Sequence, residues 1–304
     1  MQTVLDTPIF HAGPGHFLSK AIDPSLLLPP VPQFEHPRYA TPEEGEALLD
    51  RDGYLVIPGL FTGDESARLL HRLQHDGGPD SDYEVKNWCF NKSLGLDYQQ
   101  CTEWLWALDK EPGIDQLDRL LGSDCRLMSA SLWATGPGRA MGIHVDHQAL
   151  LVPDGIAIPQ TVQIPCFLAV LIGALEDQDP SMGPTMVVPG SHKRMPSADG
   201  PRQQPIGLVL KRGNGLLLRG DLCHGAMPNT GTRRHHFHST WGNVYVETSG
   251  PPMRYTHYWA PEVIAAVSPR QRRILGGWSH ANGGREAVWR HEQGLPPSGA
   301  VYGR

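Results

Sequence analysis

Short apolar runs, separated by glycine, proline and aspartate, dominate the chain from about residue 126 onward. Five of them are rich in Val, Ile, Leu or Thr: residues 127–135, 161–175, 183–191, 206–218 and 235–246. Many short runs with such turn residues between them predict the strands of a sandwich or barrel rather than a parallel sheet. Asn214-Gly215, inside the fourth run, is close to a hairpin signal. The pattern therefore predicts a mainly β core.

The N-terminal quarter follows a different pattern, helix then strand then helix. Residues 41–44 (TPEE) offer an N-cap, a proline at the first helical position and a capping-box glutamate, which predict the start of a helix. The apolar run at residues 54–57 ends at Pro58-Gly59 and predicts a strand. Residues 62–65 (TGDE) form a second capping box, followed by leucines at helical spacing.

The two ends of the chain differ from its middle. Prolines interrupt residues 1–40, which predicts an extended arm. Ser268-Pro269 predicts another helix start within a helical tail at residues 260–304. We therefore expect residues 41–304 to form a single domain, with its β core at about residues 126–248.

Composition narrows the possible classes of protein. The 304 residues are 39% hydrophobic and 19% charged, with a formal net charge of -6, so the chain is globular and is not expected to bind nucleic acid. The short basic cluster of Arg270, Arg272 and Arg273 is expected to be a solvated helix face. No run reaches the roughly 20 apolar residues of a membrane span, and no signal peptide is evident, so we expect a cytoplasmic location. Five cysteines without a CxxC pair predict reduced thiols.

The segment GIHVDHQAL, residues 142–150, concentrates polar side chains in a stretch otherwise suited to a buried strand. On a strand, His144 and Asp146 share one face, while Val145 and His147 share the other. A structural ion pair is one interpretation of His-x-Asp; metal chelation is the other. A third ligand is available in His224, which follows the apolar run at residues 216–218. Two histidines and one carboxylate, with open positions opposite them, are diagnostic of non-haem Fe(II) oxygenases.

Four motifs in order strengthen the second interpretation. They are residues 52–73 (DGYLVIPGLFTGDESARLLHRL), His144-x-Asp146, residues 183–194 (GPTMVVPGSHKR) and residues 220–229 (GDLCHGAMPN). From about residue 50 to about residue 245, the chain resembles the phytanoyl-CoA dioxygenase family of iron(II)- and 2-oxoglutarate-dependent oxygenases. The resemblance implies a double-stranded β-helix, a jelly-roll or cupin-like core with flanking α-helices. It also implies Fe(II) held by the three ligands, with 2-oxoglutarate and dioxygen as co-substrates.

The resemblance further implies an arginine, soon after the distal histidine, that binds the remote carboxylate of 2-oxoglutarate. Arg233 and Arg234 are both available, and strand alternation allows only one to face inward. Aligning the arginines favours Arg233, with Arg234 as the alternative. Thr185 matches a position where relatives place a threonine against the co-substrate, although threonine is also a good β former. Residues 189–192 (PGSH) are expected to form a structural turn rather than to supply a ligand.

Other imidazoles and aromatic rings are candidates for contact with a substrate. His236 and His238 share one strand face and His235 the other, so at least one imidazole should lie near the barrel interior. Trp88 and Phe90 could belong to a substrate lid, although aromatic residues are more commonly core.

The predicted reaction is hydroxylation of an unactivated carbon in a small molecule such as a specialised metabolite; desaturation, ring closure or epoxidation are related outcomes. Halogenation is disfavoured because Asp146 keeps the carboxylate that related halogenases lack. A coenzyme A thioester would need basic residues for its phosphates, and no basic cluster lies near the motifs. Two alternatives stay open, namely a cupin-like metal enzyme that does not use 2-oxoglutarate, and a non-catalytic β-sandwich binding module.

Overall fold

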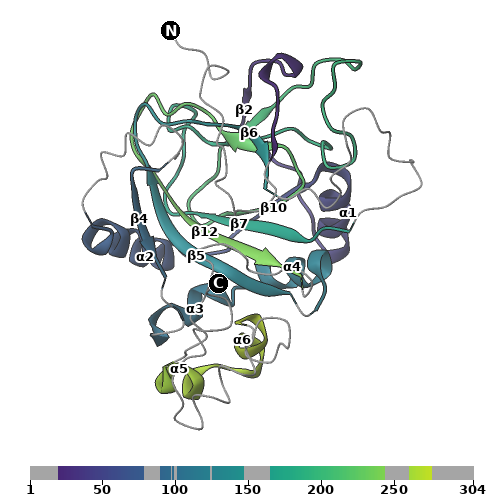
Figure 1. The fold of residues 1–304 in the computed structure, drawn as a ribbon. Helices are drawn as coiled ribbons and strands as arrows, with labels where there is room; N and C mark the ends of the chain where they lie inside the picture. The colour runs from purple at the N-terminus through teal and green to yellow at the C-terminus, as the bar shows by residue number, and fades with distance from the viewer. Residues whose placement is uncertain are drawn as a thin grey trace, which may run out of the picture.

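Two six-stranded sheets lie face to face in the computed structural model (Figure 1). The structure describes residues 20–78, 90–96, 98, 101–123, 125–146, 165–243 and 260–275. We call the sheet with the order β1-β6-β11-β8-β9-β2 the first sheet, and the sheet with the order β3-β10-β7-β12-β5-β4 the second sheet.

The first sheet is built from short strands, antiparallel except for the β2–β9 pair. Its members are β1 (Lys20–Ala21), β6 (Met141–Val145), β11 (His224–Ala226), β8 (Thr185–Val187), β9 (Ile206–Leu208) and β2 (Val31–Gln33). Both edge strands come from the predicted N-terminal arm, which also holds the short helix η2 (Pro24–Leu26). Ile22 and Leu27 of this segment are buried against the outer face of the sheet.

The second sheet is fully antiparallel and contains the longer strands. They are β3 (Tyr54–Ile57), β10 (Gly215–Arg219), β7 (Leu168–Ala174), β12 (Arg234–Gly242), β5 (Arg126–Thr135) and β4 (Lys92–Gly95). From β5 to β12 the chain passes repeatedly between the two sheets. This alternation confirms the predicted mainly β, double-stranded β-helix core.

Helices cover the outer face of the second sheet (Figure 1). They are α1 (Pro42–Asp52), α2 (Gly63–Asp76), η3 (Thr102–Trp104), α3 (Leu105–Leu108), α4 (Gly113–Leu121), α5 (Pro261–Ala266) and α6 (Pro269–Ile274). The predicted helix starts are confirmed, since Thr41, Thr62 and Ser268 each accept a hydrogen bond from the third residue of their helix. Leu69, Leu117 and Phe237 illustrate the shared core, because a helix face and the outer face of the sheet are buried together.

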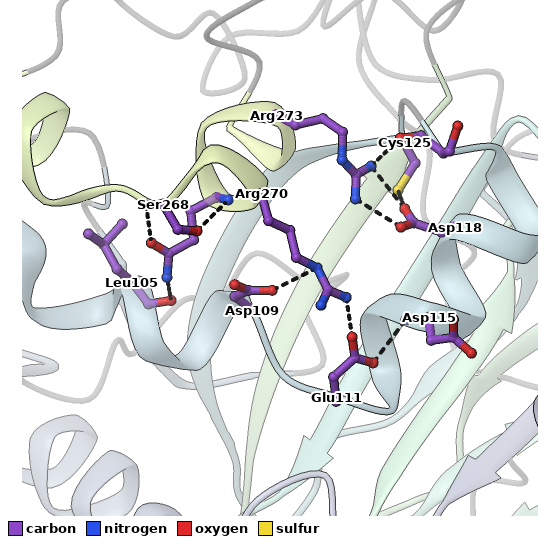
Figure 2. A network of polar contacts seen from close by, with 11 residues as sticks. Leu105, Asp109, Glu111, Asp115, Asp118, Cys125, Ser268, Arg270 and Arg273 are labelled. Atoms are coloured by element: carbon purple, nitrogen blue, oxygen red, sulfur yellow. Dashed lines mark hydrogen bonds and ion pairs between the residues drawn. The ribbon is translucent and has the colours of Figure 1, made fainter.

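The basic residues of α6 differ from the solvated face that the sequence predicted. Arg270 pairs with Asp109 and Glu111, and Arg273 makes two hydrogen bonds to Asp118, at 2.9 and 2.8 Å (Figure 2). The prediction was wrong because the acidic residues that α6 meets lie some 150 positions earlier in the chain.

The hairpin expected around Asn214-Gly215 is also absent. Strand β9 belongs to the first sheet and β10 to the second, so residues 209–214 cross between the sheets. The Asn214 side chain accepts a hydrogen bond from the Gly59 amide at 3.2 Å, which ties this crossing to the loop after β3. The chain does turn at this point, but the strands on either side pair with strands distant in the sequence and not with each other.

A second buried cluster fills the space between the sheets. Val170, Ile172, Leu216 and Leu218 of the second sheet meet Val187 and Leu208 of the first. Ile143, Val145, Met186 and Val188 instead pack on the outer face of the first sheet. Residues that alternate with this outer set, His144 among them, therefore face inward.

Within the described ranges, each helix is too short or too polar to cross a membrane. Cys101, Cys125, Cys166 and Cys223 do not form disulfide bonds.

Candidate metal centre

The three residues predicted as ligands meet on neighbouring strands of the first sheet. His144 on β6 lies directly opposite His224, the first residue of β11, and Asp146 follows the end of β6. The Nε2 atoms of His144 and His224 each lie 3.4 Å from an oxygen of Asp146, and the two ring centroids are 4.6 Å apart. The sequence predicted His224 at a strand end after the run at residues 216–218; it is the first residue of β11, whereas that run forms β10 in the other sheet.

Backbone carbonyls orient both imidazoles. The Nδ1 atom of His144 lies 2.9 Å from the carbonyl oxygen of Gly142, and that of His224 lies 2.9 Å from the carbonyl oxygen of Leu222. A carbonyl oxygen only accepts, so each Nδ1 carries the proton and donates it. Nε2, the other ring nitrogen, faces Asp146 in both residues and is the atom through which the neutral ring would bind a metal. Hydrogen bonds of this kind fix the ring and the tautomer of metal-binding histidines.

The cluster is largely enclosed. His144 is 9% exposed, His224 is 8% exposed, and the Asp146 side chain is 28% exposed. Desolvation alone would raise the pKa of Asp146, but the neighbouring imidazoles outweigh it and hold the pKa well below the usual value. Desolvation would lower the pKa of His224, whereas the Asp146 carboxylate raises it overall. Asp146 is therefore ionised, the form in which a carboxylate binds a metal.

These donors fit a divalent transition metal. Ligand atoms from the three side chains lie within 4.8 Å of one another, and they form the one such group among the described residues. Bonds of about 2 Å at right angles would separate neighbouring ligand atoms by about 3 Å, near the 3.4 Å between each Nε2 atom and an Asp146 oxygen. Imidazole and carboxylate suit a metal such as iron, whereas structural zinc sites more often use thiolates in closed coordination.

An arginine is buried beside this cluster, and it is Arg234. Arg234 is 2% exposed and donates from Nη1 to the hydroxyl of Thr185 at 3.1 Å, whereas Arg233 is partly exposed. The sequence favoured Arg233. The difference follows from the register of β12 against β5, in which Arg234 pairs with Thr135. The Asn229 side chain donates to the Thr135 carbonyl at 2.9 Å at the same end of this strand pair.

Thr185 connects the arginine to the metal-binding strands. It lies on β8 opposite Ala226, two residues beyond His224 on β11. Two residues along a strand span about 7 Å, a distance comparable with the length of extended 2-oxoglutarate. The buried guanidinium of Arg234 therefore contacts a residue that pairs with β11 two positions from His224.

Aromatic and imidazole rings occupy the inner face of β12 and β5. His238 stacks on Trp133 with ring centroids 4.0 Å apart and an interplanar angle of 11°, and Phe90 stacks on the same indole at 4.5 Å. Burial lowers the pKa of His238 to about 4 and that of His236 well below its usual value, so both rings are neutral near pH 7. His238 also interacts electrostatically with Asp146, which makes it a neighbour of the metal centre.

Trp133 was not among the site residues predicted from the sequence. Its alternation with buried residues along β5 was visible in the sequence, but its partner His238 depends on how β5 and β12 pair. Trp88 and His147 lie outside the described residues. His192 is not one of the clustered ligands; its Nε2 donates to the Asp50 carbonyl at 2.9 Å.

Comparison with known families bears directly on this arrangement. The family model described as Phytanoyl-CoA dioxygenase (PhyH) matches residues 49–236. The chain belongs to the phytanoyl-CoA dioxygenase family. The match spans all three candidate ligands, and the resemblance stated from the motifs is confirmed.

One curated relative has a low sequence identity to this chain. The ectoine dioxygenase of Stutzerimonas stutzeri (strain A1501) is 28% identical over 160 residues, which are 48% of this chain and 48% of that protein. The chain thus matches about half the length of this curated relative.

Two solved structures share the fold of this family member. HygX from Streptomyces hygroscopicus, with nickel and 2-oxoglutarate bound, has a TM-score of 0.52 at 17% identity, over 68% of this chain and 89% of HygX. The epimerase SnoN, in complex with Fe3+, alpha ketoglutarate and nogalamycin RO, has a TM-score of 0.51 at 18% identity, over 75% of this chain and 92% of SnoN. At such identities the likeness shows the fold alone.

Proposed function

We propose that this chain is an Fe(II)- and 2-oxoglutarate-dependent dioxygenase that hydroxylates an unactivated carbon of a small molecule. One observation carries the proposal: the imidazole Nε2 atoms of His144 and His224 both face Asp146, with their Nδ1 protons already donated to backbone carbonyls. Membership of the phytanoyl-CoA dioxygenase family and the match to an ectoine dioxygenase support the same reaction class.

His144, Asp146 and His224 would hold the iron, which supplies the activation of dioxygen needed to oxidise an unreactive C–H bond. The side chains themselves would position the metal. Gly142 and Leu222 keep the two imidazoles in the ligand tautomer through their carbonyl groups. Retention of the Asp146 carboxylate supports hydroxylation over halogenation.

Arg234, rather than Arg233, is our candidate for the remote carboxylate of 2-oxoglutarate. Its planar guanidinium can bind both oxygens of a carboxylate, and its burial strengthens the attraction. Thr185 already accepts a hydrogen bond from Arg234, which leaves its own proton free to be donated to the same carboxylate.

The substrate would lie against the inner face of β5 and β12. Trp133 and His238 there are partly exposed and next to the metal centre, and a neutral imidazole can both donate and accept a hydrogen bond. HygX and SnoN are described with hygromycin B and nogalamycin RO bound. A small specialised metabolite is therefore the substrate class we propose.

Anaerobic titration with Fe(II), then with 2-oxoglutarate, tests this function. The wild type should develop a visible metal-to-ligand charge-transfer band, and Asp146→Ala should develop none. Arg234→Leu should weaken 2-oxoglutarate binding by about 100-fold or more, because removing one partner of a buried ion pair costs about 3–5 kcal/mol.

Arg233→Leu is the matched control and should change that affinity by less than about threefold. If Arg233→Leu weakened 2-oxoglutarate binding more than Arg234→Leu, the carboxylate site would be assigned to Arg233 instead. Fe(II) binding without any 2-oxoglutarate band would favour a cupin-like enzyme that does not use this co-substrate. No Fe(II) binding at all would favour a non-catalytic binding module.

A further inference from the structure

Cys223, which precedes the ligand His224, is hydrogen-bonded to the turn at residues 189–192 (PGSH) and to Val188 just before it. The Cys223 carbonyl accepts a hydrogen bond from the Val188 amide at 2.9 Å, and the Cys223 amide donates to the hydroxyl oxygen of Ser191 at 2.9 Å. Both backbone polar groups of Cys223 are thus bound by one short segment. Ser191 and Cys223 are each 0% exposed.

A side chain makes this bond because the strand pairing ends there. Val187, the last residue of β8, pairs with His224, so Cys223 and Val188 would come next in the antiparallel ladder. In a regular ladder the Cys223 amide would donate to the Val188 carbonyl. That carbonyl instead accepts from the Ser191 amide at 3.2 Å, and the Ser191 hydroxyl takes its place as the acceptor.

The turn itself is anchored to the end of α1. The Gly190 amide donates to the Asp52 carbonyl at 2.9 Å, and His192 donates to the Asp50 carbonyl at 2.9 Å. A side-chain carbon at Gly53 would come within 2.6 Å of both His192 and Leu222, so helix, turn and ligand strand are in close contact. The Ser191 hydroxyl is therefore held in place by bonds that do not involve the metal centre.

His224 depends on the two residues before it. Leu222 accepts the Nδ1 proton of its ring, and Cys223 joins Leu222 to His224. We propose that Ser191 is a positioning residue, which fixes the Cys223 peptide and through it the orientation of the His224 imidazole. This inference rests on the proposed function, because it assigns Ser191 to the same metal centre.

Fe(II) affinity, measured anaerobically by competition with a chelator, tests the inference directly. Ser191→Ala should weaken Fe(II) binding about tenfold, the lower end of the effect of removing a group that orients a metal ligand. Ser191→Thr keeps the hydroxyl and should stay within about threefold of the wild type. If Ser191→Ala does not fold, Ser191→Cys keeps the side-chain size with a weaker acceptor, and should give an intermediate loss.

Ser239→Ala is the matched control. Ser239 is also 0% exposed, and its hydroxyl bonds the Leu171 carbonyl and Trp241 on the outer side of β12, away from the ligands. Its substitution should lower the free energy of unfolding but leave Fe(II) affinity unchanged. If Ser191→Ala loses stability and keeps Fe(II) affinity within twofold of the wild type, the role inferred for Ser191 is wrong, while the proposed function is unaffected. If the wild type binds no Fe(II), the proposed function fails and this inference with it.

Discussion

The inner face of the second sheet has two halves of opposite character. Strands β3, β10 and β7 present apolar side chains to the first sheet, for example Val56, Leu218 and Ile172. In the same sheet, β12 lies beside β7 and β5 lies beside β12 (Figure 1). The inward positions of these two strands hold Arg234, His236, His238, Thr240, Ser129, Ser131 and Trp133. The apolar side chains that hold the two sheets together and the polar side chains available for chemistry therefore lie on the same face of the sheet, but on different strands.

Burial differs between the halves in the same way. The apolar half is closed by Val187 and Leu208 of the first sheet, and its members are almost completely buried. In the polar half Ser131, Trp133 and His238 keep partial exposure. The apolar half therefore stabilises the two-sheet packing, while the polar half is open to a bound molecule.

The largest expected effect comes from the apolar half. Leu218→Ala should lower the free energy of unfolding by about 3 kcal/mol, because Leu218 is 0% exposed between the sheets and its loss leaves a cavity. Denaturant unfolding measures the change. At a temperature where the variant is folded, its Fe(II) affinity should match the wild type; a tenfold loss there would show that the two halves are coupled.

The polar half should instead make the stability of the folded protein depend on pH. Burial, reinforced by the charge of Arg234, holds the pKa of His236 well below its usual value of 6.5. Above pH 6.5 the His236 ring is neutral in both the folded and the unfolded protein. Below pH 6.5 the unfolded chain gains a proton that the folded protein does not, so stability falls as the pH falls.

His236→Leu should therefore flatten the dependence of the unfolding free energy on pH between 6.5 and 5.5 by about 1 kcal/mol per pH unit. Denaturation curves of the metal-free protein at several pH values give this slope. His236 Nδ1 is buried without a hydrogen-bond partner, so the variant should not be less stable than the wild type at pH 7.5. Parallel pH profiles for the two proteins would contradict the assignment.

Local patterns in the sequence were sufficient to predict much of this arrangement. Strand alternation gave the common face of His144 and Asp146, because Ile143 and Val145 on either side are apolar and pack outward. The capping residues Thr41, Thr62 and Ser268 gave three helix starts. Each of these features depends on neighbours within a few positions.

Features that depend on distant neighbours could not be predicted in this way. Alternation showed that only one of Arg233 and Arg234 faces inward, but which of them does so depends on the register of β12 against β5, a strand far away in the sequence. The stack of His238 on Trp133 requires the register of β5 against β12. The role inferred for Ser191 likewise requires knowing that β8 and β11 are neighbours.

The smallest expected effect lies outside both halves, where α6 meets α4 (Figure 2). Arg273 and Asp118 form a two-bond pair with side chains 27% and 26% exposed, and Cys125 donates to the same carboxylate. Solvent screens such a pair, so a double-mutant cycle of Arg273→Gln and Asp118→Asn should give a coupling of about 0.5–1 kcal/mol in unfolding free energy. Fe(II) affinity should not change in any of the three variants, since the second sheet separates this pair from the ligands. A coupling of zero would mean that α6 is held by its buried Ile274 and by the apolar core it joins, with the ion pair contributing nothing measurable.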